Sequence, residues 1–449
     1  ARFNFSHGTH EDHKKRYEQV ERIRNELRLP IPAILDTKGP EVRIKSFKDD
    51  NPVELKTGSE FTLTTEDVIG DEKRAAINYP NLASDIETGV TILIDDGLLE
   101  LKVTEIDRKE SGDDIRCKVI HGGMLKPNKS CNFPGIHLSM PYLSERDKSD
   151  LLFGIKTGFD IVAASFVTRD EDIIQIRKLL DENGGKDISI IAKIENQSGV
   201  DDMDAIIDYA DGIMVARGDM GVEIPFIKLP EIQKTIIRKV VSRGKYVITA
   251  TQMLESMTTA PRPTRAEISD VANAVYDGTS AVMLSAESAA GKYPIESVKA
   301  LDAICSEAEE NGEFTALHEY VEEHGMKDTN PIRSSICKAA KNIAQAVGAK
   351  AIIVESATGR VARAMVHYRP DCPVIAVATS QLVCRKLCLN WGVMAVMGEE
   401  KRTSDSITKQ AMEKALSTGV VKKGDTVVVL SSNKTCPTSS TDSLNVRIL

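Results

Sequence analysis

A run of alternating strands and helices between residues 160 and 288 constrains the fold of this chain more than any other feature. Short apolar segments alternate there with stretches such as 170–183 and 229–243, which carry apolar residues at helical spacing. This alternation predicts parallel strands joined by right-handed helical crossovers. The predicted strands are 160–166, 187–195, 212–219, 246–253 and 280–288.

Each of these strands ends in polar or charged residues. In a (β/α)8 barrel the C-terminal ends of the strands carry the chemistry, so polar residues at several strand ends predict one shared site. Two earlier segments, 2–8 and 32–40, fit the same pattern and raise the number of predicted strands to seven. We therefore predict an α/β fold built on a (β/α)8 TIM barrel, whose first strand is absent and would lie upstream of Ala1.

Two further regions differ from the barrel pattern. Residues 42–137 contain short alternating strands, turn residues and no convincing helix, which predicts an inserted all-β domain that acts as a lid over the site. In residues 311–449 strands again alternate with helices, which predicts a C-terminal open α/β domain. The barrel would then comprise residues 1–41 and 138–310, with its end in the polar stretch 306–314.

Composition excludes several classes of protein. The net charge of −9 and the pI near 5.6 argue against a general nucleic-acid or membrane-surface binder. No apolar run approaches the ~20 residues that a membrane span needs. The eight cysteines are scattered, and the closest pair, Cys384 and Cys388, has helical spacing rather than that of a metal site or disulfide framework. A cytoplasmic protein is expected.

Three charged residues stand out at the ends of two apolar strands. Glu195 and Asp219 are carboxylates at the ends of neighbouring strands and could hold a hard divalent cation, with Lys193 beside whatever anion the cation binds. Gly218 would let the backbone approach a ligand closely. The alternative is structural, because each carboxylate could instead pair with Lys193 or Arg217 to close the mouth of the barrel.

A second set of polar residues follows the first two predicted strands. Oxygen ligands with one carboxylate suit a monovalent cation, and arginines suit phosphate oxygens. Asn and Ser after a strand also form ordinary turns, and His7 reads equally well as a loop histidine. The set comprises Arg2, Asn4, Ser6, Asp36, Thr37 and Arg43.

Hydroxyl groups near strand ends leave two interpretations open. Thr251 and Ser285 either cap the next helix or contribute to the site. Ser356, Thr358 and Gly359 follow an apolar strand and precede a predicted helix, so they form either a phosphate cradle or an ordinary N-cap.

Seven motifs, in order along essentially the whole chain, closely resemble the pyruvate kinase family. This family combines a (β/α)8 barrel, a β-barrel lid and a C-terminal α/β domain that often binds effectors, and its members form homotetramers. The resemblance implies a bacterial-type member without the family's N-terminal segment. The motifs are NFSHG, DTKGPE, AKIEN, MVARGD, ATQMLESM, RPTRAE and VANAVYDGT.

The resemblance implies transfer of the phosphoryl group of phosphoenolpyruvate to ADP, which gives pyruvate and ATP in the last step of glycolysis. It also implies a requirement for Mg²⁺ or Mn²⁺ and for K⁺. Glu195 and Asp219 match the divalent-metal ligands, and Lys193 matches the residue that neutralises charge on the phosphoryl group. Arg217 matches no catalytic position, so a structural ion pair is expected for it.

Further positions match by motif. Arg2 and Gly218 match substrate positions, and Glu41 is the residue type associated with potassium dependence. Thr251 matches a substrate position and, with Ser285 and an ordered water, would relay a proton to the enolate. The potassium positions are Asn4, Ser6, Asp36 and Thr37, the nucleotide-side positions include His7, Arg43 and Arg146, and the sugar-phosphate effector positions are Ser356, Thr358 and Gly359.

The chain departs from the family pattern at several positions. Arg146 replaces a lysine, Ala286 a glycine, and Ala290 a lysine near the nucleotide phosphates, so weaker ADP binding is expected. Residues 431–443 lack the glycine pattern of the family's second effector loop, which leaves the effector unidentified. Two rival functions stay open: another Mg²⁺-dependent barrel enzyme acting on pyruvate or its enolate, and a catalytically impaired sensor of sugar phosphates.

Overall fold

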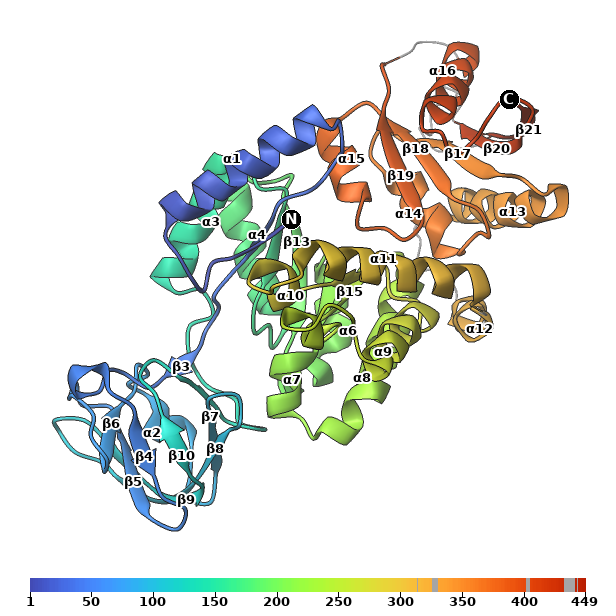
Figure 1. The fold of residues 1–449 in the computed structure, drawn as a ribbon. Helices are drawn as coiled ribbons and strands as arrows, with labels where there is room; N and C mark the ends of the chain where they lie inside the picture. Colours follow the sequence, from blue (N-terminus) through green and yellow to red (C-terminus); the bar gives the residue numbers. More distant parts are fainter. Residues whose placement is uncertain (313, 325–329, 401–403, 432–440, 442) are drawn as a thin grey trace.

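The computed structural model describes residues 1–312, 314–324, 330–400, 404–431, 441 and 443–449. Figure 1 shows three bodies: an all-β body in blue and cyan, a central α/β body in green and yellow, and a C-terminal α/β body in orange and red. The predicted fold class is confirmed. Among the described residues no helix is long and apolar enough to cross a membrane.

The central body contains one seven-stranded parallel sheet, as the sequence pattern predicts. Its neighbours run in the order β1, β2, β12, β13, β14, β15 and β16, with helices between successive strands. Within the described residues β1 and β16 each pair on one side only, so the sheet is open where an eighth strand would close it. The strands are Arg2–Asn4, Ile34–Asp36, Ile161–Ala164, Ser189–Ile194, Gly212–Ala216, Tyr246–Ala250 and Ala281–Met283.

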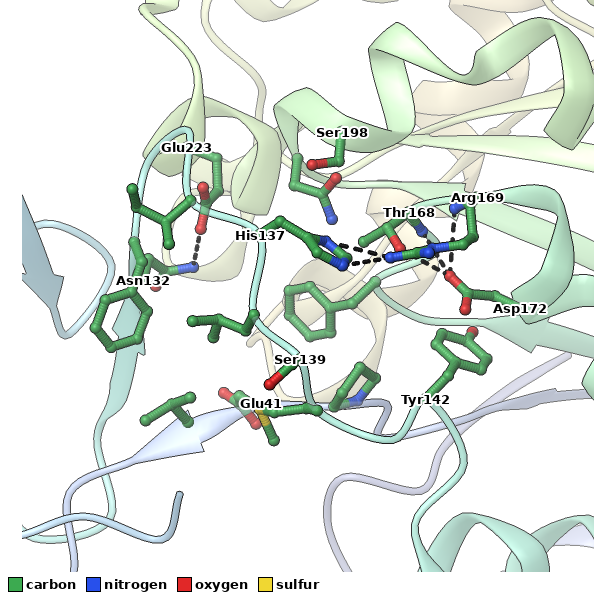
Figure 2. A pocket seen from close by; sticks show the side chains of 18 of the residues that line it. Glu41, Asn132, His137, Ser139, Tyr142, Thr168, Arg169, Asp172, Ser198 and Glu223 are labelled. Atoms are coloured by element: carbon green, nitrogen blue, oxygen red, sulfur yellow. Dashed lines mark hydrogen bonds between the residues drawn. The ribbon is translucent and has the colours of Figure 1, made fainter. Parts of the chain in front are cut away.

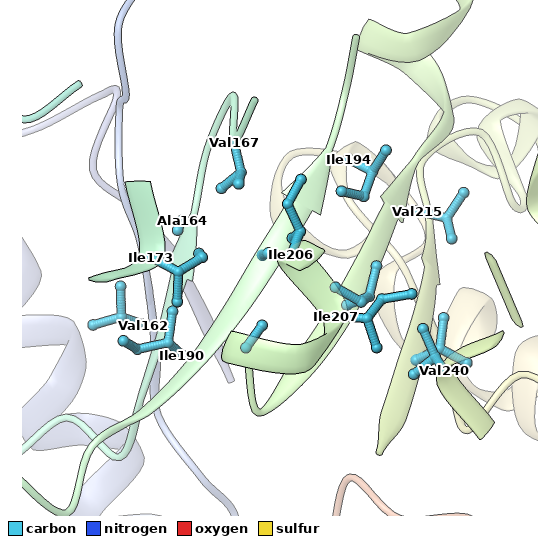
Figure 3. Packing of buried hydrophobic residues seen from close by; sticks show 14 of the residues in the cluster. Val162, Ala164, Val167, Ile173, Ile190, Ile194, Ile206, Ile207, Val215 and Val240 are labelled. Carbon is cyan, nitrogen blue, oxygen red and sulfur yellow. The ribbon is translucent and has the colours of Figure 1, made fainter. Parts of the chain in front are cut away.

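Strand alternation divides the side chains of this sheet between two cores. Ile190 and Ile194 of β13 face outward and pack with Ile206 and Val240 of the surrounding helices, which Figure 3 shows. Ile191 faces inward with residues of the neighbouring strands. Because side chains alternate with a period of two, Lys193 and Glu195 share the inner face with Ile191.

Helices cover the outside of the sheet, and several begin with capping boxes. The side chains of Thr9, Ser144 and Thr264 each accept a hydrogen bond from the backbone N–H of an acidic residue three positions later. The carboxylate of that acidic residue in turn accepts the backbone N–H of the capping residue. These caps fix where the chain leaves each loop. The helices are α1 His10–Glu26, α3 Glu145–Thr157, α4 Asp170–Glu182, α5 Gln197–Asp201, α6 Met203–Tyr209, α7 Arg217–Glu223, α8 Leu229–Ser242, α9 Arg265–Tyr276, α10 Ala286–Ala289, α11 Pro294–Asn311 and α12 Thr315–His324.

The strands of the central sheet end earlier than predicted. β14 ends at Ala216 and β15 at Ala250, where the last pairing between these two strands occurs. Arg217 and Asp219 therefore lie on the first turn of α7 rather than on a strand. Thr251 follows β15 in a left-handed conformation, with φ of 67°, which cannot continue the strand.

The all-β body is inserted between β2 and β12. Its main sheet is antiparallel except where β5 and β6 run parallel, and β4 pairs with β10 beside it. The prediction of no helix here is wrong at one turn, α2 Leu82–Asp85, which packs Leu82 into the core of this body. The strands are β3 Val42–Arg43, β4 Val53–Leu55, β5 Glu60–Thr64, β6 Arg74–Ala76, β7 Thr91–Ile94, β8 Leu99–Asp107, β9 Asp114–His121, β10 Gly123–Leu125 and β11 Ser130–Asn132.

The C-terminal body is an open five-stranded sheet with helices, as predicted. Its order is β19, β18, β17, β20 and β21, parallel except for the antiparallel edge strand β21. Most of the predicted second effector loop, 432–440 and 442, lies outside the described residues. The elements are α13 Pro331–Val347, β17 Ala351–Glu355, α14 Arg360–His367, β18 Val374–Ala378, α15 Gln381–Leu387, β19 Val393–Met397, α16 Ser404–Ser417, β20 Thr426–Ser431 and β21 Ser443–Ile448.

Candidate active site

A polar cavity of about 320 Å³ lies between the carboxyl ends of the barrel strands and the inserted body, which we call the lid. It brings together eight of the predicted site residues from four different segments. They are Arg2, Asn4, Ser6, His7, Arg43, Lys193, Glu195 and Asp219.

Lys193 is the centre of the charge network at the floor of this cavity. Its Nζ donates to Ser165 Oγ at 2.7 Å and to Asp36 Oδ1 at 3.1 Å, and lies 2.9 Å from Glu195 Oε1. Burial opposes the charge on Lys193, but Asp36 and Glu195 outweigh burial and raise its pKa. The ammonium group is therefore held charged and aimed at the cavity floor.

The carboxylate of Glu195 has fewer hydrogen-bond partners than that of Asp36 beside it. Its Oε2 accepts the backbone N–H of Phe166 at 2.6 Å, whereas its buried Oε1 accepts no well-aligned hydrogen bond from the described residues. Burial raises the pKa of Glu195 to about 7; Lys193 counteracts this shift and Asp219 adds to it. Burial also raises the pKa of Asp219, again against the effect of Lys193.

This excess of negative charge fits a divalent cation. Glu195 and Asp219 supply oxygen ligands of the kind that Mg²⁺ and Mn²⁺ prefer, and Glu195 Oε1, which faces Lys193 but accepts no well-aligned hydrogen bond from the described residues, is placed to bind one. No group of three His, Cys, Asp or Glu side chains that could hold a metal occurs among the described residues. The protein would thus supply two ligand groups and leave the remaining positions to water and substrate.

The predicted potassium residues lie together but differ in exposure. Asn4 and Asp36 are register partners on β1 and β2, and Thr37 follows directly. Asp36 is buried with Arg2 Nε on one oxygen and with Lys193 and Ser165 on the other. Burial opposes its charge, but Lys193 and Arg2 outweigh burial and lower its pKa. Asn4 and Ser6 line the cavity, whereas Asp36 and Thr37 lie beneath its surface.

Comparison with known proteins identifies the architecture around this cavity. The family model described as "Pyruvate kinase, barrel domain" matches residues 1–298, and that described as "Pyruvate kinase, alpha/beta domain" matches residues 334–447. The chain belongs to the pyruvate kinase family.

Relatives and a solved structure agree with this assignment. The pyruvate kinase of Clostridium acetobutylicum is 46% identical over 451 residues, which cover 100% of this chain and 93% of the relative. That of Staphylococcus aureus strain MRSA252 is 41% identical over 452 residues, covering 100% and 76%. The crystal structure of a pyruvate kinase from Cryptosporidium parvum superposes with a TM-score of 0.92 at 35% identity, covering 100% of this chain and 90% of that one.

The predicted activity is thereby confirmed. This pyruvate kinase converts phosphoenolpyruvate and ADP to pyruvate and ATP, and its family requires a divalent metal. The two rival functions, another barrel enzyme and an impaired sensor, are not supported, because the similarity extends over the whole chain to enzymes of this one class.

Thr251 and Ser285 of this pyruvate kinase lie at the strand ends but do not line the cavity described above. Thr251 Oγ1 accepts the N–H of Gly218 at 2.7 Å and donates to Ala250 O at 2.6 Å. Thr251 thus caps the first turn of α7 from the neighbouring strand, rather than capping its own next helix. Ser285 precedes α10, and its N–H donates to Glu287 Oε2 at 2.7 Å.

Arg217 forms the structural ion pair that was expected. Its Nη1 lies 2.8 Å from Asp270 Oδ1, and its Nη2 donates to Thr251 O at 2.7 Å. Arg146 donates to Phe5 O at 2.9 Å from the outer side of the loop that carries Ser6 and His7, and it does not line the cavity. Its predicted contact with the nucleotide stays a prediction.

Sequence reasoning missed the part of the cavity that the lid contributes. Lys129 pairs with Asp95 at 2.6 Å, and the tight turn at Asp95 and Asp96 is a hairpin tip with both φ angles at 55°. The pattern DDG identifies a turn, but not that the turn faces the barrel. Glu41, already singled out for potassium dependence, also lines the cavity, and the lining residues that were not predicted are Lys38, Asp95, Asp96, Lys129, Ser130, Asn132, Ser165 and Phe166.

The predicted effector segment lies in the C-terminal body, where a strand turns into a helix. Ser356 is buried and donates its N–H to Val377 O at 3.1 Å, while Thr358 is exposed. Gly359 has φ of 76° and is the N-cap of α14. The N–H of Gly359 donates to Ser356 O at 3.4 Å, so a phosphate here would have to bind the N–H groups of the first turn of α14, which an ordinary N-cap leaves in the same arrangement.

Proposed function

We propose that this pyruvate kinase binds the transferring phosphoryl group between Lys193 and a divalent cation held by Glu195 and Asp219. The unbalanced charge at the cavity floor supports this assignment most directly. A buried carboxylate, Glu195, and a half-buried one, Asp219, both with raised pKa values, face a single lysine, and Glu195 Oε1 has no aligned donor among the described residues. A divalent cation would balance this charge, and Mg²⁺ or Mn²⁺ suits the oxygen ligands.

The chain's own residues then have separate roles. Bound at this site, the cation would supply Lewis-acid stabilisation of the phosphoryl oxygens. Lys193, fixed by Ser165 and Asp36, places its positive charge where negative charge develops during transfer. Arg2, held against Asp36, is placed to bind the substrate phosphate.

Proton delivery completes the reaction, because the enolate left after transfer must gain a proton at carbon. We assign this relay to the hydroxyls of Thr251 and Ser285 with an ordered water. The position of Thr251 beside Gly218, in the same α7 turn as Asp219, supports this assignment. Gly218 gives the backbone room to approach the substrate.

Potassium is proposed to bind at Asn4, Ser6, Asp36 and Thr37. Glu41 lies 2.7 Å from Arg43 and lines the same cavity, so it adds negative charge near this site. Glu41→Lys should relax the dependence on K⁺, because a fixed ammonium would take over part of the cation's charge. An unchanged K⁺ requirement would contradict the assignment, and Glu41→Gln separates loss of the Arg43 pair from gain of a positive charge.

On the nucleotide side we propose His7, Arg43 and Arg146, together with Lys129 of the lid. Arg43, Lys129 and His7 line the same cavity as the metal pair. Ala286 and Ala290, at the two ends of the short helix α10, supply no charge where the family has a lysine, so ADP should bind more weakly.

The remaining proposals concern organisation and regulation. We propose domain limits near 1–41 with 138–310, 42–137 and 311–449, which the separate hydrophobic clusters of the three bodies support. A sugar phosphate is proposed to bind at Ser356, Thr358 and Gly359. Homotetramer formation follows the family, and the described cysteines, all free thiols, favour the cytoplasm.

An assay coupled to lactate dehydrogenase, with phosphoenolpyruvate, ADP, Mg²⁺ and K⁺, tests the metal assignment. Glu195→Gln and Asp219→Asn should each weaken the apparent affinity for Mg²⁺ by roughly tenfold or more, because each removes a charged ligand. Glu182→Gln, at the exposed end of α4, is the matched control. An Mg²⁺ dependence like that of the control in both variants would refute the site.

A further inference from the structure

The segment that returns from the lid to the barrel, residues 132–137, is held by two barrel side chains. Asn132 Nδ2 donates to Glu223 Oε1 at 3.0 Å. At the other end of the segment the guanidinium of Arg169 contacts the ring of His137. Figure 2 shows these two contacts on opposite sides of a second cavity of about 380 Å³, next to the hinge of the lid.

We propose that Glu223 is a positioning residue that holds the lid, through Asn132, at the angle that brings its cationic groups to the nucleotide. The inference deepens the proposed function, because it rests on the assignment of the nucleotide to the lid side of the active site. Glu223 itself lines only the second cavity, whereas Asn132 lines both. An effect of Glu223 on nucleotide binding would therefore pass through Asn132.

Glu223 is well placed to fix the lid relative to the metal pair. It is the last residue of α7, one helical turn after Asp219, so the two side chains share a face of a short rigid helix. Burial raises the pKa of Glu223, while the bonds from the Asn132 side chain and the Phe133 backbone counteract that shift. The carboxylate thus accepts a hydrogen bond from Asn132, at the start of the lid segment.

Movement at Asn132 would carry the nucleotide-side groups with it. Asn132 is the last residue of β11, and β11 pairs with β3 at the root of the lid, with Ser130 opposite Arg43 and Cys131 opposite Val42. Lys129 directly precedes β11. Arg43 and Lys129 would therefore move together with the β3–β11 strand pair that Glu223 holds through Asn132. Lys193, Glu195 and Asp219 belong to the barrel and would not move with it.

This geometry predicts an effect that separates the two substrates. Glu223→Ala should raise the KM for ADP about tenfold and leave the KM for phosphoenolpyruvate within about twofold, because the phosphoenolpyruvate groups do not move. Asn132→Asp should do the same, because it sets a second carboxylate against Glu223. Glu182→Ala, an exposed acid on α4, is the matched control and should change neither KM.

A swapped pair provides the rescue. Glu223→Gln combined with Asn132→Asp rebuilds an amide and a carboxylate facing each other with their positions exchanged, so the KM for ADP should return to within about threefold of the starting protein. The thermal midpoint of each variant, measured alongside, shows that the KM values belong to folded enzyme. Glu223→Gln alone keeps the acceptor and should give a smaller rise than Glu223→Ala.

Two results would overturn the proposal. Equal increases of both KM values in Glu223→Ala would place its effect on Asp219 and the metal rather than on the lid. Failure of the swapped pair to recover, when both single variants are folded and impaired, would show that the contact between the two side chains is not what matters. Failure of the proposed metal site would appear in the Glu195 and Asp219 variants instead, so the two proposals can fail separately.

Discussion

The two ends of the barrel strands both bury acidic side chains, but they balance the charge differently. At the N-terminal end Asp160, 1% exposed, lies 2.7 Å from Arg385 of the C-terminal body and 3.4 Å from Arg24 of α1, and accepts the N–H of Ala33 at 2.9 Å. At the C-terminal end Glu195, 0% exposed, shares one lysine with Asp36 and leaves an oxygen without an aligned donor among the described residues.

This difference separates structure from function within one sheet. Both oxygens of Asp160 have partners within the protein, and these partners lie on three other segments. Its role is therefore structural. The metal pair is left short of positive charge, and the protein tolerates raised pKa values there because a ligand completes the balance. Chemistry at the carboxyl ends and stability at the amino ends is the general arrangement of such barrels.

The largest expected effect is at the C-terminal ends of the strands, where the active site lies. Lys193→Ala should lower kcat about a thousandfold, equivalent to roughly 4 kcal/mol, because the positive charge that Lys193 places on the phosphoryl group during transfer is lost. Turnover in the coupled assay measures the loss, and gel filtration should show an unchanged oligomer. Lys156→Ala, on the exposed end of α3, is the control. Normal turnover of Lys193→Ala would refute the assigned role.

At the N-terminal ends of the strands, replacing a buried charged residue by alanine should affect stability instead. Asp160→Ala leaves Arg24 and Arg385 without their buried partner, which costs about 3–5 kcal/mol of unfolding free energy. Urea unfolding, followed separately for each transition, measures this loss. Asp181→Ala removes only a surface pair with Arg177 and should cost about 0–1 kcal/mol. Equal costs in the two variants would remove the distinction between the ends of the sheet.

Much of this contrast could be predicted from sequence, but not all. The apolar runs and their helical intervals predict the seven strands, and a period of two places Lys193 and Glu195 on one face. Asp160 was not singled out, because its partners Arg24 and Arg385 are distant in sequence and only the packed fold brings them together. Long-range ion pairs leave no local pattern.

The lid side of the site shows the same limit. Asp95 and Lys129 read as turn residues because their loops are short and polar, and nothing in the pattern states which surface a hinged body faces. The predicted strand ends at Asp219 and Met253 were wrong for a related reason. Apolar periodicity continues into α7, whereas backbone pairing stops at Ala216.

A smaller effect is expected from pH. The pKa of Glu195, raised to about 7 by burial against the effect of Lys193, means that the metal must displace a proton near neutrality. The apparent affinity for Mg²⁺ should therefore tighten roughly tenfold between pH 6 and pH 8, or about 1.4 kcal/mol. Calorimetric titration in buffers of different ionisation enthalpy reports the proton release directly.

The same shift predicts the sign of the stability change without metal. A carboxyl whose pKa is raised on folding binds its proton more tightly in the folded state, so the unfolding free energy falls as pH rises from about 4.5 to about 7. Saturating Mg²⁺ should reverse this trend by favouring the ionised form. In Glu195→Gln the pH dependence of Mg²⁺ affinity should disappear and that of stability should shrink to the part that Asp219 contributes; a pH dependence of Mg²⁺ affinity that persists there would assign the proton to another group.

The smallest expected effect is at a second contact near the N-terminal ends of the strands, between Arg369 and Trp391. Arg369 donates to Gly278 O, just before β16, and its guanidinium lies 4.6 Å from the centre of the Trp391 ring. Trp391→Leu keeps an apolar side chain but removes the cation–π contact, which should cost about 0.5–2 kcal/mol, and Trp391→Phe should cost less. Unfolding midpoints give the difference. Because the ion pair of Asp160 with Arg385 remains in this variant, kcat should stay within twofold. A larger loss of kcat would show that contacts at the N-terminal ends of the strands also set the geometry of the active site at their C-terminal ends.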